Sequence, residues 1–210
     1  VVAEAERLGC QLIISHHPLL FHPLKTVSDT TYQQRCVIRA VTSGIAIYSA
    51  HTSLDNARGG VNFKIAEKIG LEGLCWLSAR EDADAGSGVI GELRAPMAER
   101  AFLLMLKDKF GVRCLKHSAT TGKMIKRVAV CGGAGAFLLP DAIHKEADCF
   151  VCGEFHYHDW FENSGVTMAE LGHYESEQFT QELLLELLSS AFPGIDARIT
   201  AAHTNPINCL

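Results

Sequence analysis

The sequence predicts an α/β protein in which several strands deliver polar side chains to one edge of a sheet. Short apolar runs alternate with longer stretches whose apolar residues recur at helical spacing, as in alternating strands and helices. In three places an apolar run passes directly into histidines or carboxylates: 13–18, 45–55 and 166–177. Since ligands bind at the carboxyl ends of strands in open α/β sheets, this edge is the predicted functional site.

Composition is that of an ordinary globular protein. The chain has 210 residues, of which 48% are hydrophobic and 20% charged, enough for one large domain or two small ones. A net charge of −5 offers no basic surface, so nucleic acid is not an expected partner. No apolar run approaches the ~20 residues of a membrane span. Charges interrupt 1–8, which is therefore not a signal peptide, and its helical pattern leads us to expect residues ahead of Val1.

The eight cysteines contain a single C-x-x-C, formed by Cys149 and Cys152. It lies in a strand-like run, where alternation sends the two thiols to opposite faces. Zinc binding or redox chemistry is the alternative, but buried apolar thiols in a reducing compartment are favoured. We therefore expect a cytoplasmic protein in which both thiols are inert.

Helices are marked by apolar stripes and by glycines at their carboxyl ends. Gly44, Gly70 and Gly111 each follow such a stripe. The helices expected on this basis are 1–9, 32–43, 61–69, 97–110, 136–145 and 178–191.

Strands are indicated by short runs rich in β-branched and apolar residues. The expected strands are 11–15, 45–49, 89–93, 112–115, 127–131, 149–152, 166–171 and 197–202. We expect the core to include Ile13, Ile45, Ile47, Leu184 and Leu187.

The polar stretch 79–87 is the predicted linker, because the stretch itself has almost nothing to bury. It divides the chain into a first half, 1–78, and a second half, 88–210. A faint internal repeat lays 5–17 on 142–154, with His17 opposite Glu154. This repeat favours two related α/β halves.

A set of imidazoles and carboxylates at the strand ends predicts a metal centre. The spacings His-x-x-x-Asp at 51–55 and His-x-x-x-Glu at 173–177 put both members on one face of a helical turn. Five strong ligands exceed the three that one open catalytic zinc usually takes, and they suit two ions about 3.5–4 Å apart. Without thiolates the set fits two divalent ions per chain, whether zinc, iron, manganese or magnesium. The five are His16, His17, Asp55, His173 and Glu177.

Each of these motifs also has an ordinary structural reading when taken alone. Such His-x-x-x-Asp pairs often cap helices or lie on wet surfaces. The cluster of Glu154, His156 and His158 could equally belong to a surface loop. The glycine loop 132–135 could cradle an anion, but it lacks the G-x-G-x-x-G spacing and a Walker lysine, so tight turning is favoured. No G-x-S-x-G elbow is present, which disfavours an α/β-hydrolase.

Six motifs, taken in combination and order, resemble the Nif-three-like family, whose members are also called GTP cyclohydrolase I type 2 homologues or dinuclear metal-centre proteins. The resemblance spans nearly the whole chain. The motifs occupy 13–21, 48–55, 59–62, 131–135, 153–159 and 172–177.

This resemblance implies α/β/α layers in two similar, intertwined halves with mixed sheets. It implies a dinuclear centre between them and a homohexamer whose sites face the interior. Family ligands carry over onto the five residues named above, with Glu177 as the bridging carboxylate, while His51 only fits the motif. The sequence departs from the family in lacking a first strand and helix ahead of Val1. The short stretch 79–87 stands where some relatives carry an inserted domain.

Two functions follow from these observations. The first is a metal-dependent hydrolase acting on a small molecule, a nucleotide or similar phosphoester, in which Glu154, His158 or His51 moves the proton. The second is a non-enzymatic regulatory or scaffold protein that binds metals and acts through protein partners.

Overall fold

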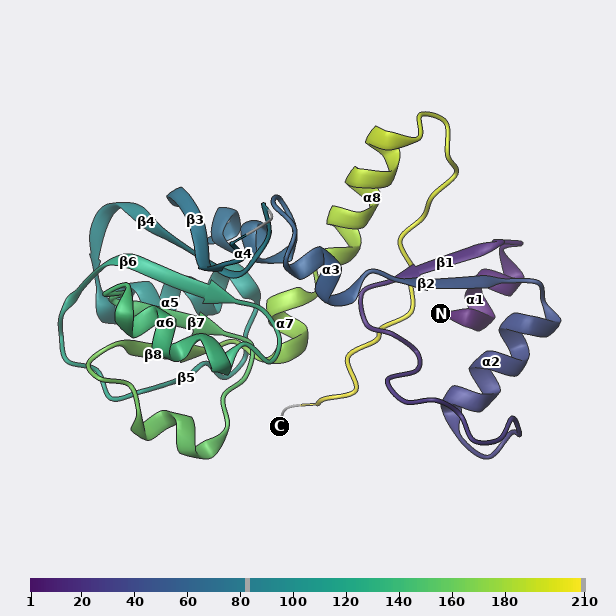
Figure 1. Cartoon of the computed structure of the whole chain (residues 1–210), viewed down its shortest axis with the longest axis horizontal. Helices are drawn as coiled ribbons and strands as arrows, with labels where there is room; N and C mark the ends of the chain where they lie inside the picture. The colour runs from purple at the N-terminus through teal and green to yellow at the C-terminus, as the bar shows by residue number, and fades with distance from the viewer. Residues whose placement is uncertain (82–83, 209–210) are drawn as a thin grey trace. The chain divides into compact units, whose positions relative to one another are not determined.

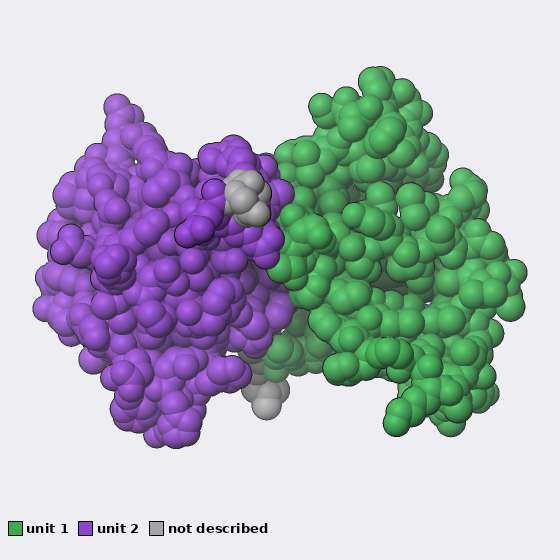
Figure 2. Space-filling model, viewed as in Figure 1, with its two compact units in different colours: residues 1–54, 180–208 green, residues 55–179, 209–210 purple. Residues whose placement is uncertain are grey.

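The computed structural model describes residues 1–81 and 84–208, which form two compact units. Unit 1 comprises Val1–Leu54 and Thr180–Asn208, and unit 2 comprises Asp55–Phe179 (Figure 2). The chain leaves unit 1 at residue 55 and returns to it at residue 180, so the two units are interleaved along the sequence.

Unit 1 is built on a parallel pair of strands joined by a helix. Strand β1 (Leu12–Ser15) pairs with β2 (Ala46–Ser49), and α2 (Tyr32–Thr42) connects them. A crossover of this kind is what parallel neighbours require. Thr31 begins α2 by accepting a hydrogen bond from the Gln34 amide at 3.3 Å. Because Ser15 lies opposite Ser49, both strands end at the same edge.

The core of unit 1 is small. Ala5 of α1 (Val2–Arg7), Ala40 and Ile45 are buried, and Ile13 and Ile47 pack against them as partly buried residues. In α8 (Thr180–Ala191) the buried leucine is Leu183. The expectation for Leu187 is wrong: this residue, one helical turn beyond the buried Leu183, is 47% exposed. The strand expected at 197–202 does not form; the Ala201 amide donates to the Glu4 carboxylate at 3.1 Å rather than to a neighbouring strand.

Unit 2 is a six-stranded mixed sheet in the order β3-β4-β6-β7-β8-β5 (Figure 1). Strands β6, β7 and β8 are parallel, and the outer pairs are antiparallel. The strands are β3 (Leu71–Ala79), β4 (Gly86–Ala98), β5 (Lys116–His117), β6 (Met124–Cys131), β7 (Cys149–Cys152) and β8 (Thr167–Glu170).

Helices cover both faces of this sheet. One face packs against α6 (Leu139–His144), with Phe150 and Met168 fully buried beneath it. The other packs against α4 (Val61–Ile69) and α5 (Glu99–Phe110). The central strands are therefore buried on both sides, as parallel strands usually are. The predicted α/β fold class, with α/β/α layers and mixed sheets, is confirmed.

The remaining elements of the chain are short. The 3₁₀ turns are η1 (Ala136–Leu138) and η2 (Tyr157–Phe161). Two one-turn helices follow strands: α3 (His51–Asp55), which spans the boundary between the units, and α7 (His173–Glu177) in unit 2. No helix in the described ranges has the length and apolar character of a membrane span.

The sequence misplaces two details of unit 2. It overlooks β3, whose pattern is broken by Gly73 and a change of register after Glu72. It also expects a strand at 112–115, whereas the short β5 begins at Lys116, where the antiparallel partner Glu170 is available.

The segment 79–87 connects β3 to β4, which pair with each other within unit 2. Residues 82–83 of this segment lie outside the described residues. The compact units are divided at residues 55 and 180 instead. The relation of 1–78 to 88–210 by an internal repeat stays a prediction.

Burial along α5 gives a direct test of where the core lies. Leu106 is fully buried and Leu104 is 57% exposed on the same helix. We expect Leu106→Ala to lower the free energy of unfolding by about 2–5 kcal/mol, through lost burial and a residual cavity. Leu104→Ala should change it by no more than about 0.5 kcal/mol. Urea denaturation of both variants measures this, and equal losses would contradict the burial described here.

Candidate metal centre

Three imidazoles cluster at the carboxyl edge of the unit 1 sheet. His16 and His17 follow β1, and His51 follows β2, where its amide donates to the His16 carbonyl at 2.9 Å. The ring centroids of His16 and His17 are 4.7 Å apart, and those of His51 lie 5.8 Å and 5.6 Å from these two rings. The parallel pairing of β1 and β2 thus brings together residues that are far apart in sequence.

His51 is held in a strained backbone conformation. Its φ is +38°, in the left-handed region that non-glycine residues rarely adopt. Such strain costs about 1–3 kcal/mol and persists where the surrounding structure imposes it. The Phe21 ring packs edge-on against the His51 imidazole at 5.5 Å. This conformation begins α3 and keeps the imidazole beside the other two.

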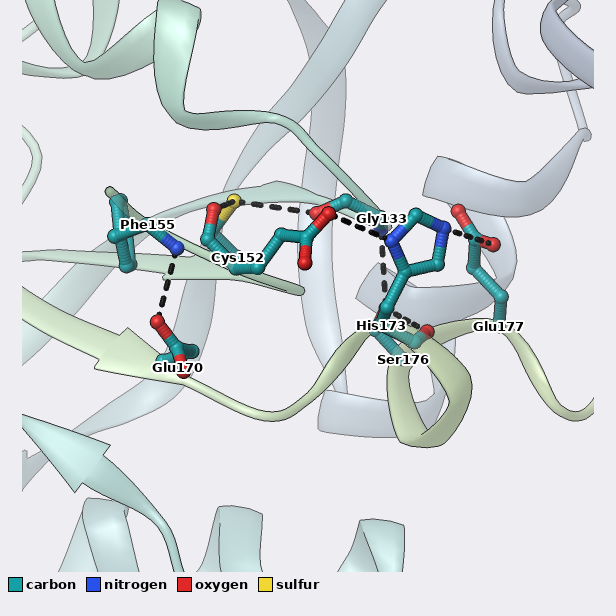
Figure 3. Close-up of polar contacts among 8 residues, drawn as sticks. Gly133, Cys152, Phe155, Glu170, His173, Ser176 and Glu177 are labelled. Carbon is teal, nitrogen blue, oxygen red and sulfur yellow. Dashed lines mark hydrogen bonds and ion pairs between the residues drawn. The ribbon is translucent and has the colours of Figure 1, made fainter. Parts of the chain in front are cut away.

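In unit 2, a histidine and a carboxylate face each other across one turn of α7. Gly172, with φ +101°, turns the chain from β8 into this helix. Nε2 of His173 lies 3.4 Å from Oε2 of Glu177, whose side chain is buried (Figure 3). Nδ1 of His173 lies 2.9 Å from Oε1 of Glu154. The predicted pairing of His173 with Glu177 on one helical face is therefore present.

The two carboxylates change the proton affinity of His173. Its hydrogen bond with Glu177 raises the pKa of His173 to about 9; burial opposes this rise, and Glu154 adds to it. A carboxylate on one imidazole nitrogen also fixes the ring for a ligand at the other nitrogen. Glu154 therefore orients His173.

The glycine loop forms the wall beside these side chains. Gly133 has φ +58°, and a Cβ there would lie 2.5 Å from Oε1 of Glu177 and 3.1 Å from Nε2 of His173. The Gly132 amide donates to Asn62 at 2.9 Å, and the Gly133 amide donates to Ser176 at 3.1 Å. Because both amides are used within the protein, the loop is a tight turn packed on Glu177, which supports the favoured interpretation over an anion cradle.

Asp55 joins the same region of unit 2. Its backbone carbonyl accepts a hydrogen bond from Asn62 at 3.0 Å, and Asn62 in turn holds Gly132. The Cys131 thiol is near both carboxylates: burial raises its pKa well above the usual value, and Cys152, Asp55 and Glu177 add to the rise. Unit 2 thus gathers three of the five predicted ligands.

The thiols do not join the donor set. Cys149 and Cys152 are buried on opposite faces of β7, as the alternation predicts. Burial raises the pKa of Cys152 to about 12 and that of Cys149 still further. Thiols that stay protonated are poor ligands and nucleophiles. Imidazole and carboxylate remain, and this set fits a borderline or hard divalent cation.

The three proposed proton carriers lie in different surroundings. Glu154 contacts His173, and His51 belongs to the imidazole cluster of unit 1. His158 lies in η2, where its ring contacts Tyr157, and no contact in the described part of the chain joins it to His173 or Glu177.

Sequence reasoning missed three buried polar residues beside the ligands. Glu170 accepts from the Phe155 amide at 2.9 Å, next to Glu154, and pairs with Lys116 at 2.5 Å. The other two, Asn62 and Ser176, bond the glycine loop. Both lie inside motifs already recognised, at 59–62 and 172–177. Their position within these motifs was the sequence signal by which they could have been identified.

The fold and this donor set define a class: an α/β/α protein with histidines and carboxylates that could hold a metal ion. The profile of the Duf34/NIF3 (NGG1p interacting factor 3) family matches residues 1–206. The chain belongs to this family, as its motifs predict.

Relatives and solved structures agree with this assignment. Proteins of Lactococcus lactis and Clostridium perfringens, each named GTP cyclohydrolase 1 type 2 homolog, are both 32% identical to the chain. The alignments cover 98% of this chain and 79% of the first, and 84% of this chain and 69% of the second. The crystal structure of a Bacillus cereus protein related to NIF3 matches with a TM-score of 0.87 and 21% identity, over all of this chain and 86% of that one.

The contact between Gly133 and Glu177 predicts a specific loss. In Gly133→Ala the new Cβ would displace the Glu177 carboxylate, so we expect metal affinity to fall at least ~10-fold. Gly111→Ala is the control, because Gly111 has φ +65° but open space around its Cβ position. Both substitutions place a side chain at a positive φ, but only Gly133→Ala should lower the affinity for metal. Calorimetric titration with Zn²⁺ or Mn²⁺ measures the difference, and equal affinities would refute the packing role.

The raised pKa of His173 predicts proton release when a metal binds. With a pKa of about 9, the imidazole is protonated at pH 7.5 in the metal-free protein. A metal ligand must be deprotonated, so binding through Nε2 should release about one proton from this group. Glu154→Gln removes one of the charges that raise the pKa, and should reduce the release. Calorimetry in buffers of different ionisation enthalpy counts the protons; identical counts for both proteins would contradict this.

Proposed function

We propose that the protein is a metal-dependent hydrolase that acts on a nucleotide or similar phosphoester, using two divalent cations per chain. The observation that carries this proposal is the pair of His173 and Glu177, packed on a glycine loop that leaves no room for a side chain. A structure built only for stability would gain from apolar residues in place of this pair.

The proposed metal ligands are the five named from the sequence. Each of His16, His17 and Glu177 offers a donor atom of the kind that binds metal ions, which supports this set. Asp55 and His173 complete it, with Glu177 as the proposed bridge. A shared carboxylate would hold two cations close together by offsetting their repulsion.

A divalent cation, when bound, supplies Lewis acidity and makes water acidic enough to act as a nucleophile near neutral pH. Glu154 holds Nδ1 of His173 and keeps Nε2 turned toward Glu177. The proposed proton carrier is His51, whose ring lies beside those of His16 and His17; it would accept a proton as water attacks the substrate and return it to the leaving group. His158, in η2, stays an alternative proton carrier in this proposal.

The substrate class follows from the relatives' name, GTP cyclohydrolase 1 type 2 homolog, which supports a nucleotide or another small molecule. The homohexamer and the cytoplasmic location are further proposals that rest on the family resemblance.

A specific observation favours the second candidate, a metal-binding regulatory or scaffold protein. The Tyr157 and Phe161 side chains on η2 are 73% and 70% exposed, and their rings contact each other at 5.4 Å. Exposed aromatic pairs of this kind are common where proteins meet. A panel of nucleotides and phosphoesters, with Mn²⁺, Zn²⁺, Fe²⁺ or Mg²⁺ restored to chelator-treated protein, separates the candidates. Turnover supports the hydrolase, whereas metal binding without turnover favours the scaffold.

Glu177→Ala tests the bridge. If Glu177 contacts both cations, its loss should lower the occupancy of both together and abolish metal-dependent turnover. Glu182→Ala on α8 is the control, since it removes an exposed carboxylate outside the donor set. Elemental analysis of the purified variants counts the metals. A Glu177 variant that retains two metals per chain would refute the bridge.

A milder result is expected for His51→Ala. If His51 moves a proton without binding a cation, turnover should fall about 10–100-fold while metal content is unchanged. Loss of both metals in this variant would instead place His51 among the ligands.

A further inference from the structure

We infer that Asn62 and Ser176 are positioning residues, which clamp the glycine loop against the ligands Asp55, His173 and Glu177. The inference rests on the proposed metal centre and adds two residues that are not themselves ligands. Both are almost completely buried, with 2% and 1% exposure, and each makes two hydrogen bonds in the region of the ligands.

Asn62 links the glycine loop to the residue that carries one ligand. It lies in the first turn of α4, where its Nδ2 donates to the Asp55 carbonyl at 3.0 Å and its Oδ1 accepts from the Gly132 amide at 2.9 Å. The amide side chain of Asn62 offers a donor and an acceptor on one rigid plane. Asn62 therefore fixes the distance between the end of α3 and the loop.

Ser176 makes the corresponding link on the other side of the loop. Its hydroxyl accepts from the Gly133 amide at 3.1 Å and donates to the His173 carbonyl at 2.8 Å (Figure 3). The residue lies between the two ligands of α7, one position before Glu177. The bond ties the helix that carries the ligands to the backbone that packs on them.

The two clamps act on consecutive peptides of one loop. Gly132 and Gly133 both approach the Glu177 side chain, because a Cβ on either would lie within 3.3 Å of it. Loss of one clamp leaves a buried amide without its partner and frees the loop to shift. Ligand side chains need to be held within about 0.5 Å of their working geometry, so a small shift should weaken metal binding.

The test compares Asn62→Ala and Ser176→Ala with Ser118→Ala. Ser118 is the matched control, since it is a buried serine that accepts from a backbone amide, that of Met168, away from the glycine loop. Metal-free proteins are titrated with Co²⁺, whose visible absorption reports the ligand geometry. We expect Asn62→Ala and Ser176→Ala to lower Co²⁺ affinity about 10–100-fold and to alter the spectrum. Ser118→Ala should lower the melting temperature comparably and leave both properties within ~2-fold of the original protein.

Amide hydrogen exchange in the metal-free proteins gives a readout that needs no ligand. Ser176→Ala should speed exchange at Gly133, and Asn62→Ala should speed it at Gly132, because these are the amides released. Faster exchange with unchanged Co²⁺ affinity and spectrum would overturn the positioning role and leave the metal centre standing. An original protein that binds no Co²⁺ would overturn the proposed metal centre, and the inference with it.

Discussion

The close approach of a glycine backbone to a buried carboxylate is the constraint on which the candidate centre depends. Gly133 has a positive φ and no space for a Cβ beside Glu177, so both the backbone conformation and the close packing require glycine at this position. That approach is possible because the loop leaves β6 where the parallel strands β7 and β8 end nearby. The sheet thus determines where the loop lies, and the loop limits where Glu177 can lie.

Charge is distributed around this contact in a way that suits a cation. His173 lies between Glu154 and Glu177, which favour its protonated form. A proton on His173 and a metal ion bound to it can therefore each offset the negative charge of these two carboxylates. The two exclude each other, because a metal ligand must be deprotonated. Burial opposes ionisation of the nearby thiols and raises the pKa of both; Asp55 and Glu177 add to the rise at Cys131, and Glu170 adds to it at Cys152. The donor set is consequently one of imidazoles and carboxylates, even with two cysteines close by.

The fold alone does not assign an activity, because one architecture can carry many chemistries. Membership of the Duf34/NIF3 family is shown, and the name of several relatives, GTP cyclohydrolase 1 type 2 homolog, is the ground on which a small-molecule substrate is proposed. An enzyme differs from a metal-binding protein in having an open coordination position at the metal and a side chain nearby that carries a proton. The strained His51, held beside two other histidines, is the feature that most favours the enzyme.

The sequence by itself determined the fold class, most of the elements and the chemistry of the donor set. Helix 61–69 and strand 149–152 agree with α4 and β7 at both ends, because apolar periodicity and end signals are local properties. The histidines and carboxylates could be named from the sequence because the residue type determines which donor atoms a side chain carries. Only the tertiary structure decided which of them meet, that His158 lies apart, and that Glu154 orients His173. It alone identified Asn62 and Ser176, because short polar side chains gain a role only from partners that folding brings from distant parts of the chain.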